Sequence, residues 1–92
     1  MIIRVRYVFY GRVQGVGFRY TAWNAALALG ITGFVRNEDD GSVTVEAQGE
    51  TASLLRFLEM LNSGRWISID RIRKEKCRPD PDEHSFRIEG GY

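Results

Sequence analysis

The sequence predicts an α+β fold of the ferredoxin-like type, with element order βαββαβ, a mostly antiparallel sheet, two helices on one face and a short extra C-terminal strand. Three observations support this prediction. The 92 residues match the length of one small domain, which we expect to span residues 1–92. Segments with two-residue periodicity alternate with two segments of helical periodicity. No repeat, linker or low-complexity tract interrupts that order.

The first third of the chain predicts a strand, a helix and a second strand. Residues 3–9 alternate apolar side chains with Arg4, Arg6 and Val8, as a half-buried strand does. After a glycine-rich stretch, apolar side chains recur at helical spacing (Phe18, Ala22, Trp23, Ala26, Leu27 and Leu29). Gly30 is the expected end of this helix. The β-branched and aromatic residues 31–37 predict the second strand.

The middle of the chain predicts the partner of that strand and a second helix. Residues 38–41 contain an Asp-Gly step and predict a hairpin turn. Residues 42–48 alternate as a third strand, which Gly49 is expected to end. Residues 51–62 then form an amphipathic helix, whose apolar side is built from Leu54, Phe57, Leu58 and Leu61.

The C-terminal part predicts two strands at the margin of the sheet. Strand periodicity returns at Trp66, and a change of phase near residues 70–71 predicts a β-bulge. The mostly charged residues 73–78 are expected at a sheet edge. A stiff turn over 79–83 precedes a short last strand over 85–88.

Composition and charge exclude several classes of function. A net charge of +1 provides no overall field for a polyanion, so an anion site has to be local. Cys77 is the only cysteine, which excludes an internal disulfide and a cysteine-based metal cluster. No stretch has the roughly 20 apolar residues of a membrane helix, and the charges near the N-terminus do not match a signal peptide. We therefore expect a cytoplasmic monomer that binds neither membranes nor nucleic acid.

The most concentrated motif is Y10-G-R-V-Q-G-V-G-F-R-Y-T21, in which Gly11, Gly15 and Gly17 fall within seven residues. Because glycine accepts positive φ, such a loop can turn successive N–H groups inward as an anion-binding nest. The helix that follows adds its positive N-terminal end. Arg19 lies in the first turn of that helix, where a cation is unfavourable unless an anion lies beside it. On its glycines alone, a loop of this kind is more often a structural turn than an anion site.

The predicted topology brings a second strand end to this loop. A strand–helix–strand crossover returns the second strand parallel to the first, so the C-terminal ends of both lie at one sheet edge. Asn37 ends the second strand, where an asparagine is either a turn former or a group that orients a water. Neither Arg19 nor Asn37 can be a general base at neutral pH. Hydrolysis of a phosphoryl group with a good leaving group fits, because positioning and charge stabilisation provide most of its catalysis.

Nucleotide-binding folds and RNA-binding modules are two other classes of protein with related features. The loop lacks the G-x-x-x-x-G-K-[ST] of a P-loop, and a dinucleotide fingerprint would need a third glycine at Tyr20. The βαββαβ order also serves RNA recognition, so a non-catalytic phosphate- or RNA-binding module is the alternative interpretation. Residues 42–48 offer no aromatic side chain for base stacking, which speaks against RNA.

Three motifs together resemble the acylphosphatase family, namely G11-R-V-Q-G-V-G-F-R19, L29-G-I-T-G-F-V-R-N37 and D40-G-S-V-T-V-E-A-Q-G49. The resemblance covers the whole chain in length and element order. It implies hydrolysis of an acyl phosphate to a carboxylate and inorganic phosphate, without a metal or other cofactor. The larger hydrogenase-maturation carbamoyltransferases carry a related motif but continue through cysteine-rich zinc modules, so we expect the free-standing small enzyme.

The resemblance also implies a role for each site residue. Arg19 would grip the phosphate bidentately, Asn37 would orient the attacking water, and a phosphate oxygen of the substrate would accept the water's proton. Arg12 lies in the same loop. Its side chain either contacts the acyl part of the substrate or is a solvent-exposed charge. The expected phosphate-binding residues are Gly11, Arg12, Val13, Gln14, Gly15, Val16, Gly17, Phe18 and Arg19. The chain departs from the family's usual pattern at Phe34, where Trp is common, and at Gly64-Arg65, where Gly-Pro is common.

The remaining chemically capable side chains are interpreted as structural. Glu38, Asp39 and Asp40 lack the alternating spacing of a calcium loop, so we interpret them as solvated turn acids. His84 stands alone among charged turn residues, and Cys77 has no histidine near it in the sequence that would make it a nucleophile.

Overall fold

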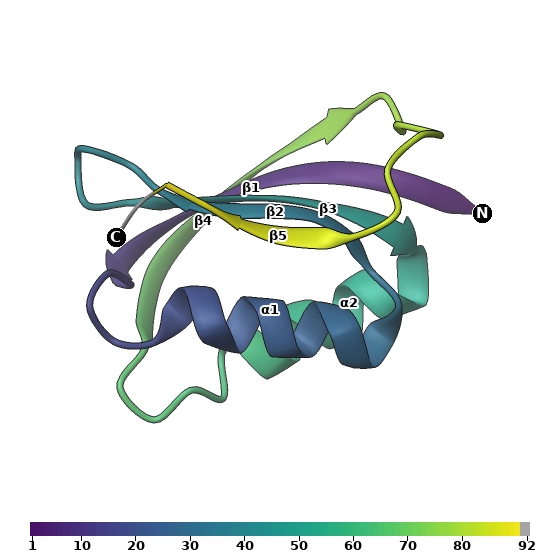
Figure 1. Ribbon diagram of the computed structural model, residues 1–92. Helices are drawn as coiled ribbons and strands as arrows, with labels where there is room; N and C mark the ends of the chain where they lie inside the picture. The colour runs from purple at the N-terminus through teal and green to yellow at the C-terminus, as the bar shows by residue number, and fades with distance from the viewer. Residues whose placement is uncertain (91–92) are drawn as a thin grey trace.

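A five-stranded sheet in the order β4-β1-β3-β2-β5 forms one layer of the molecule, and two helices cover one of its faces (Figure 1). The computed structural model describes residues 1–90. The elements in chain order are β1 (Ile2–Arg12), α1 (Phe18–Leu29), β2 (Thr32–Asn37), β3 (Val43–Glu50), α2 (Thr51–Leu61), β4 (Ser68–Cys77) and β5 (Phe86–Glu89). The predicted βαββαβ order with an added C-terminal strand is confirmed. Neither helix of the described chain is long and apolar enough to cross a membrane.

Strand pairing follows the predicted, mostly antiparallel arrangement. β1 pairs antiparallel with β3 and β4, β2 pairs antiparallel with β3, and only the short β5 runs parallel to its neighbour β2. β1 and β2 therefore run in the same direction on either side of β3, so both point their C-terminal ends at the same edge. The charged strand β4 lies at the sheet edge, as expected.

The predicted β-bulge is present where β1 meets β4. Tyr10 lies opposite Arg71, but the next residue, Gly11, lies opposite Ile69, so Asp70 is the extra residue of the bulge. Pairing then continues to Arg12. The first strand is therefore longer than the alternating pattern of residues 3–9 indicated, and Gly11 and Arg12 belong to it.

The hydrophobic core lies between the sheet and the two helices. It contains Tyr7, Phe9, Val35, Val43, Val45 and Ala47 from the sheet, and Phe18, Ala22, Ala25, Ala26, Leu54, Phe57 and Leu61 from the helices. The rings of Phe9 and Phe18 lie 5.0 Å apart, so the first residue of α1 is packed under the end of β1. This contact determines where the helix begins, and hence where the loop between the two elements has to run.

Two expectations from the sequence, one about the apolar side of α1 and one about the end of the third strand, are wrong. Leu27 does not widen the apolar side of α1, because it is exposed while Ala25 is buried. The buried residues Ala22, Ala25 and Ala26 define the side of α1 that faces the core, and Leu27 lies outside it. Gly49 does not end the third strand, since β3 continues to Glu50 through pairing of Ile3 with Gly49 and of Ile2 with Glu50. The lack of a side chain at Gly49 leaves room for Ile31, whose Cγ1 would lie 3.3 Å from an added Cβ.

The sheet face opposite the helices carries a buried charged group that the alternating pattern did not predict. Arg4 is 7% exposed. Its guanidinium donates to Glu83 through Nη1 and Nη2, at 2.7 and 3.3 Å, and to Oε1 of Glu46 at 2.9 Å. Gln48 binds the backbone of Asp80 in both directions, donating to its carbonyl and accepting from its N–H. These contacts hold the segment between β4 and β5 on the sheet and so place β5 beside β2.

This environment shifts the pKa of Glu83. Burial alone would raise the pKa of this carboxyl, but hydrogen bonds from Arg4 and Thr32 and the charges of Arg4 and Arg87 outweigh burial and lower it. A carboxyl with a lowered pKa in the folded state stabilises the protein above its unfolded pKa, and that stabilisation is lost as the pH falls through the folded pKa.

The Glu83→Gln substitution tests this linkage. We expect it to reduce the free energy of unfolding by about 1.5–3 kcal/mol at pH 7, because a charge-assisted hydrogen bond to Arg4 becomes a neutral one. The difference from the wild type should begin to shrink as the pH falls below the unfolded pKa of about 4.3, and it should vanish below the lowered folded pKa, where the wild-type carboxyl is also neutral. Urea unfolding at several pH values measures both effects. Glu59→Gln, at an exposed position on α2, is the matched control, and an equal loss at pH 7 and pH 3 would contradict the assignment.

Candidate active site

A small cavity lies at the sheet edge where β1 and β2 end and α1 begins. Its volume is about 120 Å³. It is lined by Val13, Gly15, Gly17, Phe18, Arg19, Tyr20 and Asn37. The structure thus brings the glycine loop, the first turn of α1 and the end of β2 into one place, as the topology predicted.

The loop over residues 13–17 owes its path to two glycines. Gly15 has φ 73° and Gly17 has φ 82°, in the left-handed region that other residues rarely adopt. A Cβ added at either position would meet no described atom within 4 Å, so backbone conformation rather than space requires glycine there. Gly17 is the N-cap of α1, and the N–H and hydroxyl of Thr21 both donate to its carbonyl. The N–H groups of residues 18–20 precede the first intrahelical hydrogen bond, which makes this end of the helix suitable for an anion.

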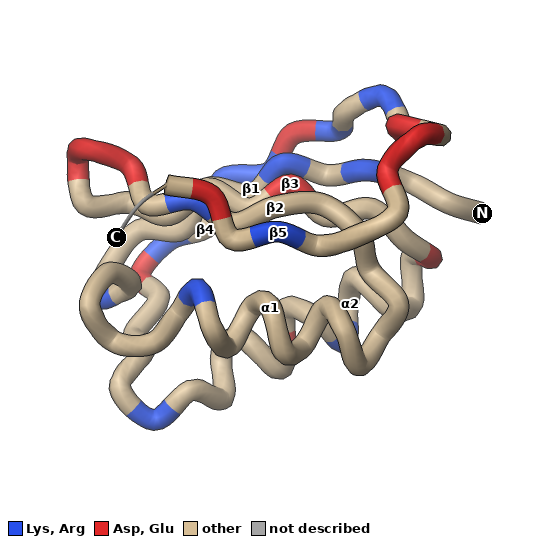
Figure 2. Tube along the Cα trace, in the orientation of Figure 1, with Lys and Arg blue, Asp and Glu red and all other residues tan. Residues whose placement is uncertain are grey.

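Arg19 places a cation at the positive end of the helix dipole. It is the only charged residue of α1, visible as the blue segment at the start of that helix in Figure 2, and the first turn contains no acidic residue. Its side chain is half-buried and lines the cavity. A cation in this position is unfavourable by roughly 0.3–1 kcal/mol near a helix N-terminus. The local electrostatics therefore favour an anion between the loop and the guanidinium.

Asn37 reaches the cavity because of strand alternation in β2. Val35 points into the core, and Asn37, two residues on, lies on the same face and ends the strand opposite Val43. Arg36 points to the other face, where Nε donates to Oε2 of Glu38 at 3.1 Å and the guanidinium lies over the Phe34 ring. The hairpin thus presents the asparagine to the cavity and keeps the neighbouring arginine away from it.

Gln14 connects the loop to the hairpin, a role that sequence reasoning missed. Its Nε2 donates to the carbonyls of Glu38 and Ser42, at 2.7 and 2.9 Å. These two residues flank the β2–β3 turn, and the N–H of Glu38 donates to the same Ser42 carbonyl. Because both acceptors are backbone atoms more than twenty residues away, the sequence carried no signal for this link. The side chain holds the glycine loop beside the strand end that carries Asn37.

The other residues expected to bind phosphate take different positions. Val13 and Phe18 are buried in the core, so only their backbone groups can face a ligand. The half-buried Val16 packs against the core. Gly11 and Arg12 are paired with β4 and do not line the cavity, and the Arg12 side chain is exposed.

Of the three turn acids, Asp39 and Asp40 are exposed, as expected for solvated acids, whereas Glu38 is half-buried. The Ser42 hydroxyl and N–H donate to Asp40, and these hydrogen bonds lower the pKa of its carboxyl. The pKa of Glu38 is lowered, mainly by a hydrogen bond from Thr44 and further by the hydrogen bond and charge of Arg36. Burial alone would raise it. Within residues 1–90, no three His, Cys, Asp or Glu side chains gather as metal ligands. His84 is exposed, and burial raises the pKa of the Cys77 thiol.

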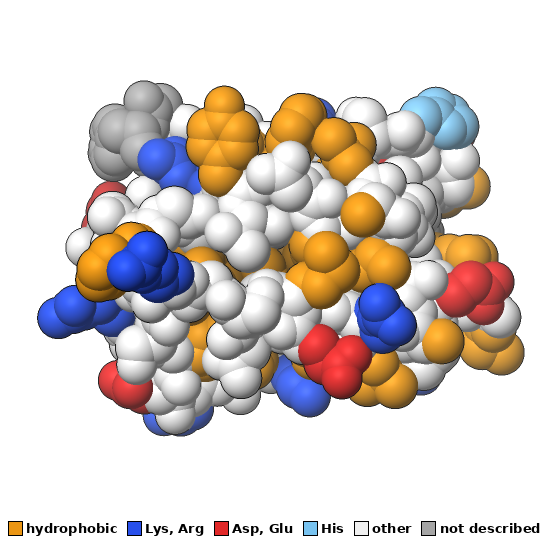
Figure 3. Space-filling view, turned by 90° about the horizontal axis from the view of Figure 1, so that it is seen from below, with side chains coloured by type: hydrophobic (Ala, Val, Ile, Leu, Met, Phe, Trp, Pro, Cys, Tyr) orange, Lys and Arg blue, Asp and Glu red, His pale blue; other side chains and the backbone are white. Residues whose placement is uncertain are grey.

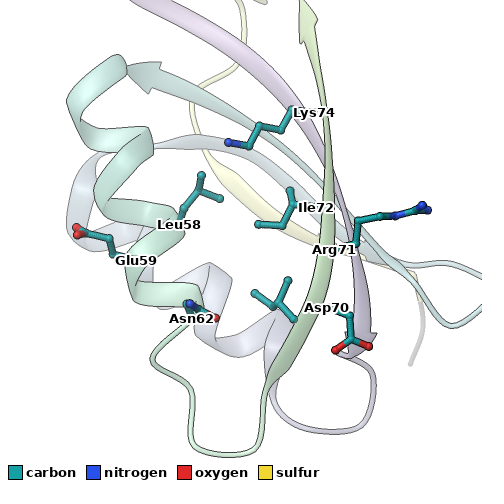
Figure 4. Close-up of a pocket in the computed structure, with 8 residues that line it drawn as sticks. Leu58, Glu59, Asn62, Asp70, Arg71, Ile72 and Lys74 are labelled. Carbon is teal, nitrogen blue, oxygen red and sulfur yellow. The ribbon is translucent and has the colours of Figure 1, made fainter.

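A larger groove lies between α2 and the edge strand β4 (Figure 4), with a volume of about 560 Å³. Leu58 and Ile72 point into it, whereas Arg71 and Asp70 project away from it on the far side of the strand. Lys74 extends from β4 toward α2, whereas the Glu59 side chain projects from the outer side of α2. The lining of this groove includes neither the glycines of the loop nor Arg19 or Asn37, so the smaller cavity is the candidate active site.

Comparison with known proteins agrees with this fold and this arrangement of motifs. The acylphosphatase family model matches residues 5–88. The chain is 43% identical to an acylphosphatase of Geobacillus thermodenitrificans (strain NG80-2) over 92% of each chain. It is 41% identical to one of Pasteurella multocida (strain Pm70), over 95% of this chain and 98% of the relative. The crystal structure of acylphosphatase from Bacillus subtilis superposes with a TM-score of 0.88 at 34% identity, covering 98% of this chain and all of the other.

The α+β fold and the matches over nearly the whole chain define a small phosphoryl-hydrolysing enzyme. The chain belongs to the acylphosphatase family, whose reaction is the hydrolysis of acyl phosphates. It spans almost the full length of both relatives.

Gln14→Ala should lower the free energy of unfolding by about 1–2 kcal/mol, because two hydrogen bonds between the loop and the hairpin are lost. Gln14→Glu should be less stable still at pH 7, since a carboxylate would face two carbonyl oxygens. Urea unfolding of both variants measures the order. Wild-type stability in Gln14→Ala would show that the link contributes nothing.

Proposed function

We propose that the chain hydrolyses acyl phosphates with the phosphoryl group held by the glycine loop and Arg19, and with the attacking water oriented by Asn37. One observation carries this proposal: Arg19 and Asn37, from different elements, line the same small cavity as Gly15 and Gly17. Of the residues expected to bind phosphate, Gly15, Gly17 and Arg19 line the cavity, and Val13 and Phe18 would contribute backbone groups only.

Phosphate binding follows from the charges at this end of α1. The N–H groups at the start of a helix and an arginine beside them offer several donors to a group with two negative charges. The guanidinium is always protonated and its planar fork matches two phosphate oxygens. A bound phosphate would also relieve the unfavourable position of Arg19 next to the helix dipole.

The reaction needs no general base from the protein. Water attacks phosphorus, the bond between phosphorus and the acyl oxygen breaks, and a phosphate oxygen of the substrate takes the water's proton. The products are a carboxylate and inorganic phosphate. The leaving carboxylate is a weak base, so it departs without protonation. Charge on the equatorial oxygens is stabilised by Arg19 and the loop amides, which is the main form of catalysis in a loose phosphoryl-transfer transition state.

The alternative, an RNA-binding module, is less well supported. The outer face of the central strand β3 presents Thr44, Glu46 and Gln48. Arg4 on the same face is buried and paired with Glu46 and Glu83. Paired charges on this face weaken its attraction for a polyanion.

Arg19→Ala should lower kcat/KM for an acyl phosphate by about 10²-fold or more, and inhibition by inorganic phosphate should be lost with it. Arg19→Lys should recover little, because an ammonium lacks the planar fork. Steady-state kinetics with EDTA present measures both, with Arg56→Ala, an exposed position on α2, as the control. Normal phosphate inhibition in Arg19→Ala would refute the binding role.

Asn37→Ala should lower kcat by about 10²-fold while inorganic phosphate still inhibits at its wild-type concentration, because the amide acts on the water rather than on the phosphate. Kinetics and phosphate inhibition distinguish this variant from Arg19→Ala. Normal turnover in a folded Asn37→Ala protein would exclude the water-orienting role.

A further inference from the structure

The candidate cavity is small compared with an acyl phosphate that carries a bulky acyl group. Its 120 Å³ falls well below the roughly 300 Å³ at which pockets begin to enclose drug-sized ligands. If the phosphoryl group and the attacking water occupy it, as the proposed function requires, the acyl group has to extend across the rim. What lies at the rim therefore decides which acyl groups the enzyme contacts.

Tyr20 is the large exposed side chain at that rim. Of the described residues that line the cavity, Val13 and Phe18 are buried, Arg19 and Asn37 are half-buried, and Gly15 and Gly17 have no side chain. Tyr20 is 68% exposed. Other exposed hydrophobic side chains lie on the helix layer, such as Leu27 and Leu55, and orange side chains are scattered over the face shown in Figure 3. Position at the cavity, and not exposure alone, distinguishes Tyr20.

The Tyr20 ring is held in place by Trp23, one turn further along α1. The two ring centroids lie 6.3 Å apart with an interplanar angle of 86°, an edge-to-face contact. Trp23 is itself half-buried and packs against the core. A ring supported in this way loses little conformational freedom when a ligand packs on it, which favours binding.

We propose that the acyl group of the substrate packs against Tyr20, and that this residue makes the enzyme prefer acyl phosphates with aromatic acyl groups over those with short aliphatic ones. The proposal rests on the proposed function, because it places the phosphoryl group in the cavity. Tyr20 acts here as a specificity-determining residue and takes no part in breaking the phosphorus–oxygen bond.

The test compares kcat/KM for benzoyl phosphate and for acetyl phosphate in the wild type and in Tyr20→Ala, Tyr20→Leu, Tyr20→Phe and Leu27→Ala. In Tyr20→Ala, the ratio of the benzoyl to the acetyl value should fall by about three- to tenfold, the size of one aromatic contact, mainly through KM. Tyr20→Leu keeps apolar volume without a ring and should lose most of the preference. Tyr20→Phe should keep the ratio within about twofold, as should Leu27→Ala, an exposed position on the same helix.

The outcomes separate this inference from the proposed function. If the wild type hydrolyses both substrates and Tyr20→Ala changes the two kcat/KM values equally, the specificity role of Tyr20 is wrong while the proposed function stands. If the wild type hydrolyses neither substrate, the proposed function fails and this inference fails with it. Urea unfolding checks that each variant is folded. If Tyr20→Ala is poorly folded, the ratio measured with Tyr20→Leu tests the proposal instead.

Discussion

The contact between Phe18 and Phe9 is the interaction on which the candidate site depends. Both side chains are fully buried and their rings lie 5.0 Å apart, which fixes the first residue of α1 to the strand that it follows. The chain therefore has only residues 13–17 in which to reverse from β1 into the helix. That short path requires positive φ at Gly15 and Gly17 and brings the amides of the loop and of the helix start together. The geometry of the proposed anion site thus follows from hydrophobic packing.

The second half of the site depends on the sheet. Asn37 is carried by β2, which is held on one side by β3 and on the other by β5. The buried contact of Arg4 with Glu83 keeps the segment before β5 on the outer sheet face. At the C-terminal end of β2, Gln14 joins the glycine loop to the β2–β3 turn. Positioning of this kind, rather than a strongly perturbed acid or base, is what phosphoryl transfer needs from a protein.

The charges of the chain serve two separate purposes on the two sheet faces. On the outer face, arginines pair with glutamates and hold strands and turns together. At the helix end of the cavity, Arg19 has no acidic residue in its own turn, and it is the residue that we propose binds the phosphate. A nearly neutral protein can bind an anion at such a local site without attracting polyanions over its surface.

The order of the elements, the bulge near residues 70–71 and the meeting of the glycine loop with Asn37 were all predictable from the sequence. Each depends on local periodicity or on the handedness of a crossover, which the chain carries within itself. The burial of Arg4, the links made by Gln14 and the continuation of β3 through Gly49 became visible only in the tertiary structure. Each depends on atoms that are distant in sequence, such as Glu83 for Arg4 and the hairpin carbonyls for Gln14. Local pattern determined which elements form and which residues lie at their ends, whereas long-range packing and hydrogen bonding decided how those ends are held.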